Sequence, residues 1–123
     1  MDFSFVHTNI NVLDLEKTLR FYRDALGLKE MRRKEAADGS FTLVFLGNET
    51  NSYQIELTWL KDREKPYDLG DNETHLAFRT NDFEAARTLH ETMGCISHEN
   101  KIFGIYFIED PDGYQIEILP VRK

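Results

Sequence analysis

The sequence of 123 residues predicts an α+β fold built from two similar modules. Each half contains strand-like segments of alternating polarity and one segment in which apolar residues recur at helical spacing. The string Tyr-Gln-Ile-Glu occurs twice, at 53–56 and 114–117, and each copy follows a histidine and a helix-like segment. Repetition of this kind indicates a duplicated unit. We expect a single domain whose modules cover about residues 1–62 and 73–123, joined by a polar linker at 61–73.

The first module is predicted to run in the order strand, helix, then two or three strands. Its strands are expected where β-branched and aromatic residues concentrate, at 5–12, 41–46 and 53–60. Apolar residues spaced three and four apart predict a helix over 15–26. Asp14 is suited to cap the start of this helix, and Gly27 is suited to end it. Gly47 and Asn48 would begin the turn between the last two strands.

The second module repeats this order. Strands are expected at 75–80, 104–109 and 114–119. Asn81 or Asp82 would cap a helix that runs to about Met93, where Gly94 would stop it. The Asp-Pro-Asp-Gly string at 110–113 predicts the turn before the last strand.

Four candidate metal ligands follow the same facing rule. Each stands opposite the mainly apolar face of its predicted strand, and the four are His7, Glu56, His75 and Glu117. Because a strand has a period of two, a shift of one residue would place each ligand beneath a helix. Two imidazoles and two carboxylates suit a divalent ion such as nickel, zinc, cobalt, manganese or iron. The sequence therefore predicts a metal site to which each module contributes a histidine and a glutamate.

Composition and charge exclude other classes of partner. The formal net charge is -7 and the basic residues are scattered, so we expect no nucleic-acid partner. No apolar stretch approaches the roughly 20 residues of a membrane span, and residues 1–4 do not begin a secretory signal. The single cysteine, Cys95, suits a reducing compartment and is expected to be a small filler residue. These features predict a cytoplasmic protein.

Two histidines and one basic cluster are given no functional role. His90 falls in the second helical segment and His98 in a polar turn, and neither has a counterpart in the first module. Both are therefore expected to be solvated. The run Arg-Arg-Lys at 32–34 is followed at once by Glu35, and we expect it to be a solvated strand end.

The chain resembles the vicinal-oxygen-chelate superfamily, and within it glyoxalase I (lactoylglutathione lyase). The matching segments cover essentially the whole chain: His-Thr at 7–8, Arg-Phe-Tyr at 20–22, Leu-Gly-Leu at 26–28, Ile-Glu-Leu-Thr at 55–58, His-Leu-Ala at 75–77 and the stretch 107–118. The resemblance implies paired βαβββ modules and a homodimer whose active sites lie at the subunit interface. It also implies that the metal is held by His7, Glu56, His75 and Glu117.

The resemblance further implies a metal-dependent lyase or isomerase involved in methylglyoxal detoxification. Its substrate would be the hemithioacetal of methylglyoxal and a thiol, glutathione or another, and its product a 2-hydroxyacyl thioester. Glu117 would be the catalytic base, and Glu56 its counterpart in the other module. The metal, the thiol and the part played by each glutamate stay open, as does whether modules pair within one chain or across the dimer.

Two positions depart from the pattern of glutathione-dependent members. An arginine that usually stands four residues after the first ligand is Asn11 here, and an asparagine four residues after the first glutamate is Leu60. Arg79, four residues after His75, is expected on the same face as that histidine. Arg79 could therefore bind a substrate carboxylate together with Asn11, or it could pair with a surface carboxylate.

Two other functions compete with this interpretation. One is another metalloenzyme of the superfamily, such as an epimerase or a thiol transferase. Superfamily members that transfer thiols generally use three protein ligands, so Glu56 as a fourth counts against that alternative. The other is a non-catalytic drug-binding resistance protein, a class that generally lacks the metal-binding quartet.

Overall fold

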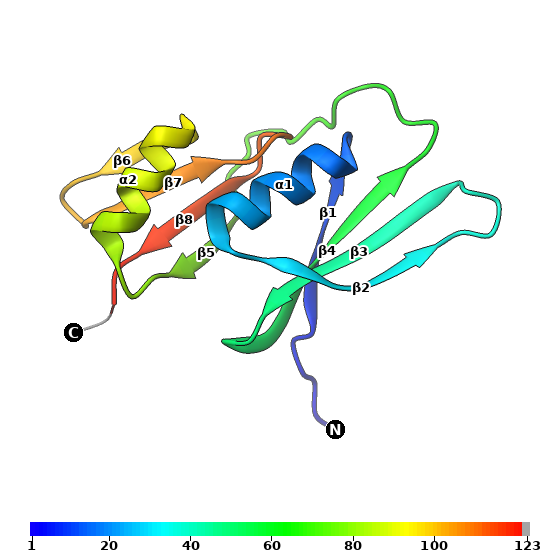
Figure 1. Ribbon diagram of the computed structural model, residues 1–123, viewed down its shortest axis with the longest axis horizontal. Coiled ribbons are helices and arrows are strands. Elements are labelled where there is room, and N and C mark those ends of the chain that lie inside the picture. The colour runs from blue at the N-terminus through cyan, green and yellow to red at the C-terminus, as the bar shows by residue number, and fades with distance from the viewer. Residues whose placement is uncertain (122–123) are drawn as a thin grey trace. The chain divides into compact units, whose positions relative to one another are not determined.

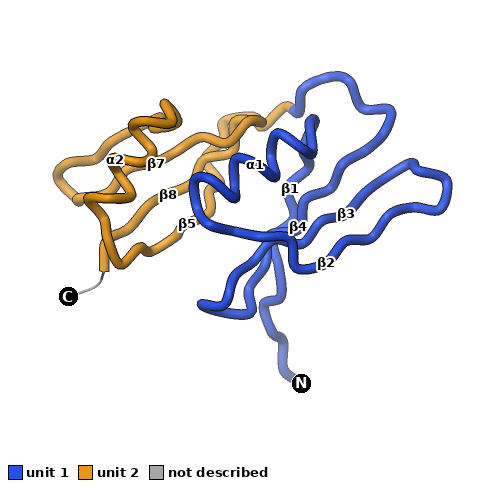
Figure 2. The backbone as a smooth tube through the Cα atoms, in the orientation of Figure 1, with its two compact units in different colours: residues 1–67 blue, residues 68–123 orange. Residues whose placement is uncertain are grey.

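The computed structural model describes residues 1–121, which form two compact units that divide between residues 67 and 68 (Figure 2). The division falls inside the linker expected at 61–73. In the described chain each unit contains one helix and one four-stranded mixed sheet (Figure 1). The predicted α+β fold of paired strand–helix–strand modules is confirmed.

Unit 1 follows the predicted order, with three strands after the helix. Its elements are β1 (His7–Val12), α1 (Leu15–Leu26), β2 (Lys29–Glu35), β3 (Phe41–Asn48) and β4 (Asn51–Leu60). The sheet has the order β1-β4-β3-β2, in which β1 runs parallel to β4 and the other pairs are antiparallel. The first and last strands of the unit are therefore neighbours in its sheet.

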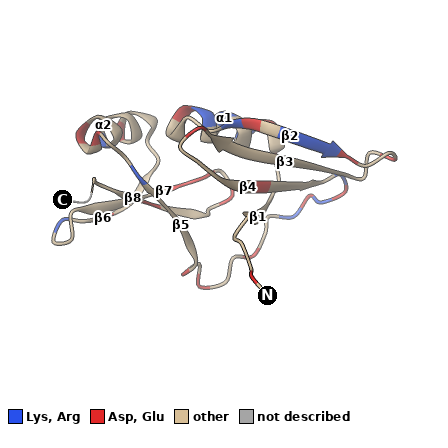
Figure 3. Ribbon diagram, turned by 90° about the horizontal axis from the view of Figure 1, so that it is seen from below, with Lys and Arg blue, Asp and Glu red and all other residues tan. Residues whose placement is uncertain are grey.

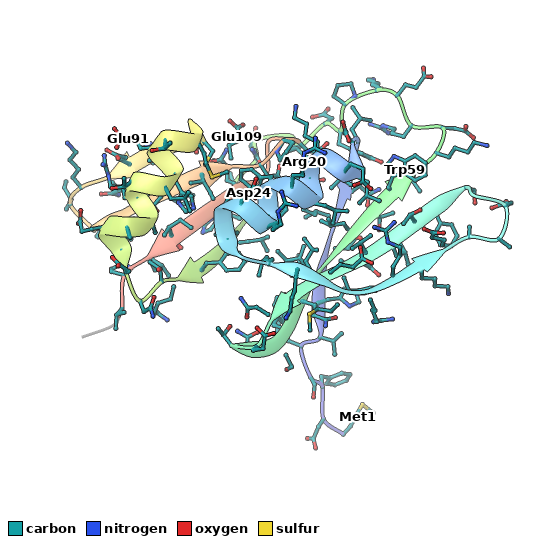
Figure 4. All side chains as sticks on the ribbon, in the orientation of Figure 1. Met1, Arg20, Asp24, Trp59, Glu91 and Glu109 are labelled. Carbon is teal, nitrogen blue, oxygen red and sulfur yellow. The ribbon has the colours of Figure 1, made fainter. Side chains whose placement is uncertain are left out.

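Helix α1 begins and ends where the sequence predicts. The Asp14 carboxylate accepts the Lys17 backbone N–H at 3.1 Å, and Gly27 adopts the left-handed conformation with φ of 66°. Its buried stripe consists of Leu15, Thr18, Tyr22 and Ala25. Arg20 and Asp24 lie one turn apart on the exposed side (Figure 4). Within residues 1–121, neither helix has the length and apolar character needed to cross a bilayer.

Unit 2 repeats the arrangement. Its elements are β5 (His75–Arg79), α2 (Phe83–Met93), β6 (Ile96–Asn100), β7 (Ile105–Glu109) and β8 (Gln115–Leu119). The order β5-β8-β7-β6 again places the first strand parallel to the last. Of the two proposed caps, Asp82 is the one that accepts the Ala85 backbone N–H, at 3.1 Å, and Gly94 ends the helix with φ of 70°.

Each sheet buries one apolar face, and its other face carries the candidate ligands among polar and aromatic side chains. On this apolar face the side chains of the central strands are almost completely enclosed: Val44, Leu46, Ile55, Leu57, Tyr106, Ile108, Ile116 and Ile118. Figure 1 shows each helix lying over one face of the sheet in its own unit. Burying such a side chain contributes about 1.5–3 kcal/mol, which holds the register that the alternation requires.

The sequence analysis left a third strand after each helix open and gave no bounds for β2 or β6. Every residue of β2 is exposed, and the basic cluster at 32–34 lies in the last part of this seven-residue edge strand, which agrees with the expected solvated strand end. Figure 3 shows the ribbon of β2 coloured for Lys and Arg over much of its length. Such strands carry no alternation of polarity, because an exposed edge gains little from apolar side chains. Charged residues at an edge also oppose pairing with another chain.

The expectation that His90 is solvated was wrong. Its side chain is buried at 1% exposure, and its Nδ1 lies 2.8 Å from the Tyr106 hydroxyl on β7. The last turn of α2 faces the sheet, so a polar residue there needs a buried partner. His98 is exposed as expected, although it lies on β6 and not in a turn. Cys95 is half-buried, and burial raises the pKa of its thiol, which suits a filler residue.

Candidate functional site

In unit 1 the structure brings His7 and Glu56 together. His7 opens β1 and Glu56 lies in the middle of β4, and the parallel register of these strands pairs Asn9 with Glu56. The histidine therefore stands two residues before the position opposite the glutamate, on the same face. Its Nε2 lies 3.6 Å from Oε1 of Glu56, and the two side chains are 35% and 16% exposed.

Unit 2 contains the same pair. His75 opens β5, Glu117 lies in β8, and the register pairs Ala77 with Glu117. Nε2 of His75 lies 3.6 Å from Oε1 of Glu117, with exposures of 39% and 19%. The duplicated sequence therefore forms a duplicated site geometry. A histidine and a carboxylate distant in sequence become neighbours because the first and last strands of each unit are parallel partners.

An aromatic ring stands beside each histidine. Phe45 lies edge-on to His7, with centroids 5.6 Å apart, and Phe107 lies edge-on to His75 at 5.1 Å. Both phenylalanines pair across the sheet with the glutamate of their own unit. Each ring contact limits the rotation of an imidazole and keeps part of its surface from water.

The tautomer of His75 fits a metal ligand. Its Nδ1 lies 3.3 Å from the backbone carbonyl oxygen of Glu73. A carbonyl oxygen only accepts, so we assign the hydrogen to Nδ1, which donates, and a neutral ring then presents the Nε2 lone pair toward Glu117. Metal-binding histidines commonly use their other ring nitrogen in this way. The residues present therefore fit a borderline divalent ion.

Each unit alone supplies two of the four expected ligands. Across residues 1–121, no three side chains of histidine, cysteine, aspartate or glutamate gather in a way that could hold an ion. Two ligands are fewer than protein sites for zinc ordinarily use. A site formed by His7, Glu56, His75 and Glu117 together thus stays a prediction.

The predicted substrate-binding residues lie on the expected faces. Arg79 ends β5 on the exposed side that also carries His75, and its Nε donates to the backbone carbonyl of Pro120 at 3.2 Å. This hydrogen bond is thus to a backbone oxygen rather than to a surface carboxylate. Asn11 lies on β1, two residues after Asn9 and on the same face, and the two amides are 2.9 Å apart.

The sequence analysis gave no role to Asn9 or Thr58, which lie next to Glu56. The Asn9 amide lies 3.0 Å from Oε1 of Glu56, and the Thr58 hydroxyl contacts the same amide. The alternation in β1 placed Asn9 on the same face as His7. The register between β1 and β4 decides which residue of β4 lies opposite Asn9. These strands are far apart in the sequence, so no local sequence pattern predicts their register.

Comparison with known proteins identifies the family. Residues 4–118 match the family model described as the Glyoxalase/Bleomycin resistance protein/Dioxygenase superfamily. The chain belongs to this superfamily. It is 41% identical to a lactoylglutathione lyase of Neisseria meningitidis, over 96% of this chain and 91% of the relative. It is 38% identical to a probable lactoylglutathione lyase of Synechocystis, over 93% and 92% of the two chains.

Solved structures of superfamily members show the same fold. A trypanothione-dependent glyoxalase I of Leishmania major is 29% identical and covers 97% of this chain and 87% of its own, with a TM-score of 0.85. Glyoxalase I of Zea mays is 30% identical with a TM-score of 0.84, and the match covers 97% of this chain but 45% of the maize chain. The expected superfamily fold and the expected lactoylglutathione lyase-like enzyme are confirmed by these comparisons.

Proposed function

We propose that the chain is a metal-dependent lyase of the glyoxalase I type. Its substrate would be the hemithioacetal of methylglyoxal and a thiol, and its product a 2-hydroxyacyl thioester. The observation that carries this proposal is the duplicated pair of histidine and glutamate, with an Nε2–Oε1 distance of 3.6 Å in both units. It occurs in a chain that is 41% identical to a lactoylglutathione lyase.

The metal ligands in this proposal are His7, Glu56, His75 and Glu117. Two neutral imidazoles and two carboxylates balance the charge of one divalent ion. Nickel or zinc suits these ligands best, and cobalt, manganese or iron is compatible. When bound, the ion supplies Lewis-acid polarisation of substrate oxygens.

Glu117 is the proposed base. Its carboxylate would take the carbon-bound proton of the hemithioacetal and return it to the neighbouring carbon, while the hydroxyl proton passes to the former carbonyl oxygen, so that the product is an isomer of the substrate. The carboxylate is 19% exposed and lies on the same face as His75, which would leave one side open to a substrate. Glu56 is its counterpart in unit 1 and would remain a ligand.

Arg79 and Asn11 are the proposed contacts to the thiol part of the substrate. Arg79 carries the charge needed for a carboxylate, and its bond to Pro120 uses Nε, which leaves the terminal nitrogens as further donors. Asn11 would offer an uncharged amide at the equivalent position of the first unit. A carboxylate-bearing thiol such as glutathione fits this pair of groups.

We also propose a homodimer with active sites at the subunit interface, in the cytoplasm. Each unit supplies two of the four ligands, so two units must combine to hold one ion. The partner unit can come from the same chain or from a second copy. A single cysteine that is half-buried suits a reducing compartment.

Metal analysis followed by a thiol comparison tests the proposal. The purified protein should retain a divalent ion, lose activity after chelation and regain it with nickel or zinc. Methylglyoxal premixed with glutathione should yield a thioester, and a panel of other thiols would identify the preferred one. Protein that binds no divalent ion and forms no thioester with any thiol would favour the drug-binding alternative. Retained metal without thioester formation would favour another reaction of the superfamily.

A further inference from the structure

The Asn9 side chain contacts the carboxylate of Glu56. These residues are direct partners in the parallel register of β1 and β4. One end of the Asn9 amide lies 3.0 Å from Oε1 of Glu56 and 3.2 Å from its backbone oxygen. Both oxygens only accept hydrogen bonds, so this end of the amide is its NH2 group. Asn9 therefore donates to the Glu56 carboxylate.

Two further side chains contact the Asn9 amide. The Thr58 hydroxyl, two residues along β4 from Glu56, contacts the same end of the amide. In this orientation the Asn9 carbonyl oxygen lies 2.9 Å from the side-chain amide of Asn11, which must present its NH2 group in order to donate. Asn9 thus belongs to a polar network that spans both strands, and Glu56 is one of its members. We call Asn9, Thr58 and Asn11 the amide network.

Unit 2 has different residues at these positions. Ala77 is the direct partner of Glu117 in the register of β5 and β8, as Asn9 is of Glu56. Leu119 stands two residues after Glu117, where Thr58 follows Glu56. A methyl group and an isobutyl group cannot donate hydrogen bonds. The two halves therefore repeat the histidine and the carboxylate but not the group that holds the carboxylate.

We propose that Asn9 is a positioning residue that fixes Glu56 as the permanent carboxylate ligand, while Glu117, which faces Ala77, is the carboxylate that moves to take the substrate proton. The inference rests on the proposed function. It explains on physical grounds why two glutamates in equivalent positions have different roles.

A hydrogen bond from a neutral amide suits a fixed ligand. It restricts the rotamers of Glu56 before the ion binds, so less conformational entropy is lost on binding. A carboxylate has about four lone-pair sites, so Glu56 can accept from Asn9 and still bind a cation. A carboxylate that acts as the base must instead move from its resting position to reach the substrate carbon. A hydrogen bond like that from Asn9 would oppose this movement.

Removing the amide tests the first half of the inference. Asn9→Ala gives unit 1 the side chain found at Ala77, and Asn9→Asp keeps the shape but places an acceptor against the carboxylate. Titration of metal-free protein with Ni²⁺ by calorimetry should show affinity reduced by about 10- to 100-fold in Asn9→Ala, as for other groups that orient metal ligands. Asn9→Asp should lose at least as much. Unchanged Ni²⁺ affinity in both folded variants would overturn the role of Asn9.

Transplanting the network tests the second half. Ala77→Asn combined with Leu119→Thr rebuilds the donor and its support beside Glu117, and Ala77→Leu with Leu119→Thr is the control of similar size without an amide. With methylglyoxal and glutathione, the transplant should lower kcat by about tenfold or more with little change in KM, because the base is restrained. Its Ni²⁺ affinity should be kept or increased. A kcat equal to that of the control would overturn the inference.

The wild-type measurements separate this inference from the proposed function. Wild-type protein that binds no Ni²⁺ and forms no thioester removes the proposed function, and the inference with it. Wild-type protein that does both, with variants that behave like it, removes the inference alone. Circular dichroism and thermal unfolding of each variant would identify any change due to misfolding.

Discussion

Nε2 of His75 lies 3.6 Å from Oε1 of Glu117, and an edge-on phenylalanine stands beside the imidazole. The same distance separates His7 from Glu56 in unit 1. Geometry alone therefore does not distinguish the two carboxylates. Their surroundings distinguish them, because Glu56 lies opposite Asn9 and Glu117 lies opposite Ala77.

The first prediction concerns Glu117→Gln. The substituted amide keeps an oxygen that can bind a metal but cannot take up a proton, so we expect turnover to fall by about 100-fold or more. Much of the metal affinity should remain. Steady-state assays and Ni²⁺ titration of the same preparation would measure both quantities. Full activity in this variant would show that Glu117 is not the base.

The variant Glu56→Gln is the matched comparison for that experiment. It weakens a ligand that we expect to be fixed, so its main effect should be on metal affinity. At saturating metal its loss of kcat should be smaller than that of Glu117→Gln. Identical losses in the two variants would indicate that the carboxylates share both roles.

The second prediction concerns substrate binding by Arg79. Charge reversal in Arg79→Glu should raise KM for the glutathione adduct far more than it lowers kcat, because the interaction is with a part of the substrate that does not react. Arg23→Glu is a suitable control, since Arg23 is an exposed residue of α1 whose ion pair is with its neighbour Asp24. A KM unchanged by Arg79→Glu would remove this residue from the site.

The third prediction concerns stability at alkaline pH. Burial raises the pKa of Tyr106 to about 12, compared with about 10 for an exposed phenol. The unfolded chain therefore loses this proton at a lower pH than the folded chain does. The stabilisation linked to this group is complete below about pH 10 and is lost as the pH rises toward 12.

Tyr106→Phe tests this assignment. The free energy of unfolding, measured by urea denaturation, should fall less steeply in the variant than in the wild type between about pH 10 and pH 12. At neutral pH the variant should be less stable by about 1–3 kcal/mol, because the buried Nδ1 of His90 loses the Tyr106 hydroxyl. Parallel pH dependence in the two proteins would contradict the assignment.

The fourth prediction concerns the turn before β8. The Asp110 side chain is buried at 4% exposure, and its carboxylate accepts the backbone N–H groups of Asp112 at 2.9 Å and Tyr114 at 3.0 Å. Asp110→Ala should reduce the free energy of unfolding by about 1–3 kcal/mol, because these donors lose their partner. Asp110→Asn keeps an acceptor oxygen and should lose less. Equal stability of all three proteins in urea would exclude this role.

Local physics explains what could be read from the sequence. Asp14 and Gly27 mark the ends of α1 because capping and left-handed backbone depend on one residue and its neighbours. The alternation around Glu56 and Glu117 placed both on the face opposite the buried residues, since a strand has a period of two. Repetition of the whole pattern supplied the α+β modules and the four candidate ligands.

Other features depend on contacts between distant segments. β2 carries no apolar pattern because it is an exposed edge, and its pairing with β3 is visible only in the assembled sheet. His90 is buried because α2 packs with its last turn toward β7, which the residues around it do not indicate.

The sequence was thus sufficient for the modules, their helix ends and the faces that carry two histidines and two glutamates, because these follow from short-range periodicity and from duplication. Only the folded chain decided that His7 meets Glu56, that His75 meets Glu117, and that Asn9 holds one of the two carboxylates. Those contacts depend on the parallel register of strands that lie at opposite ends of each module, and register is a property of the assembled sheet.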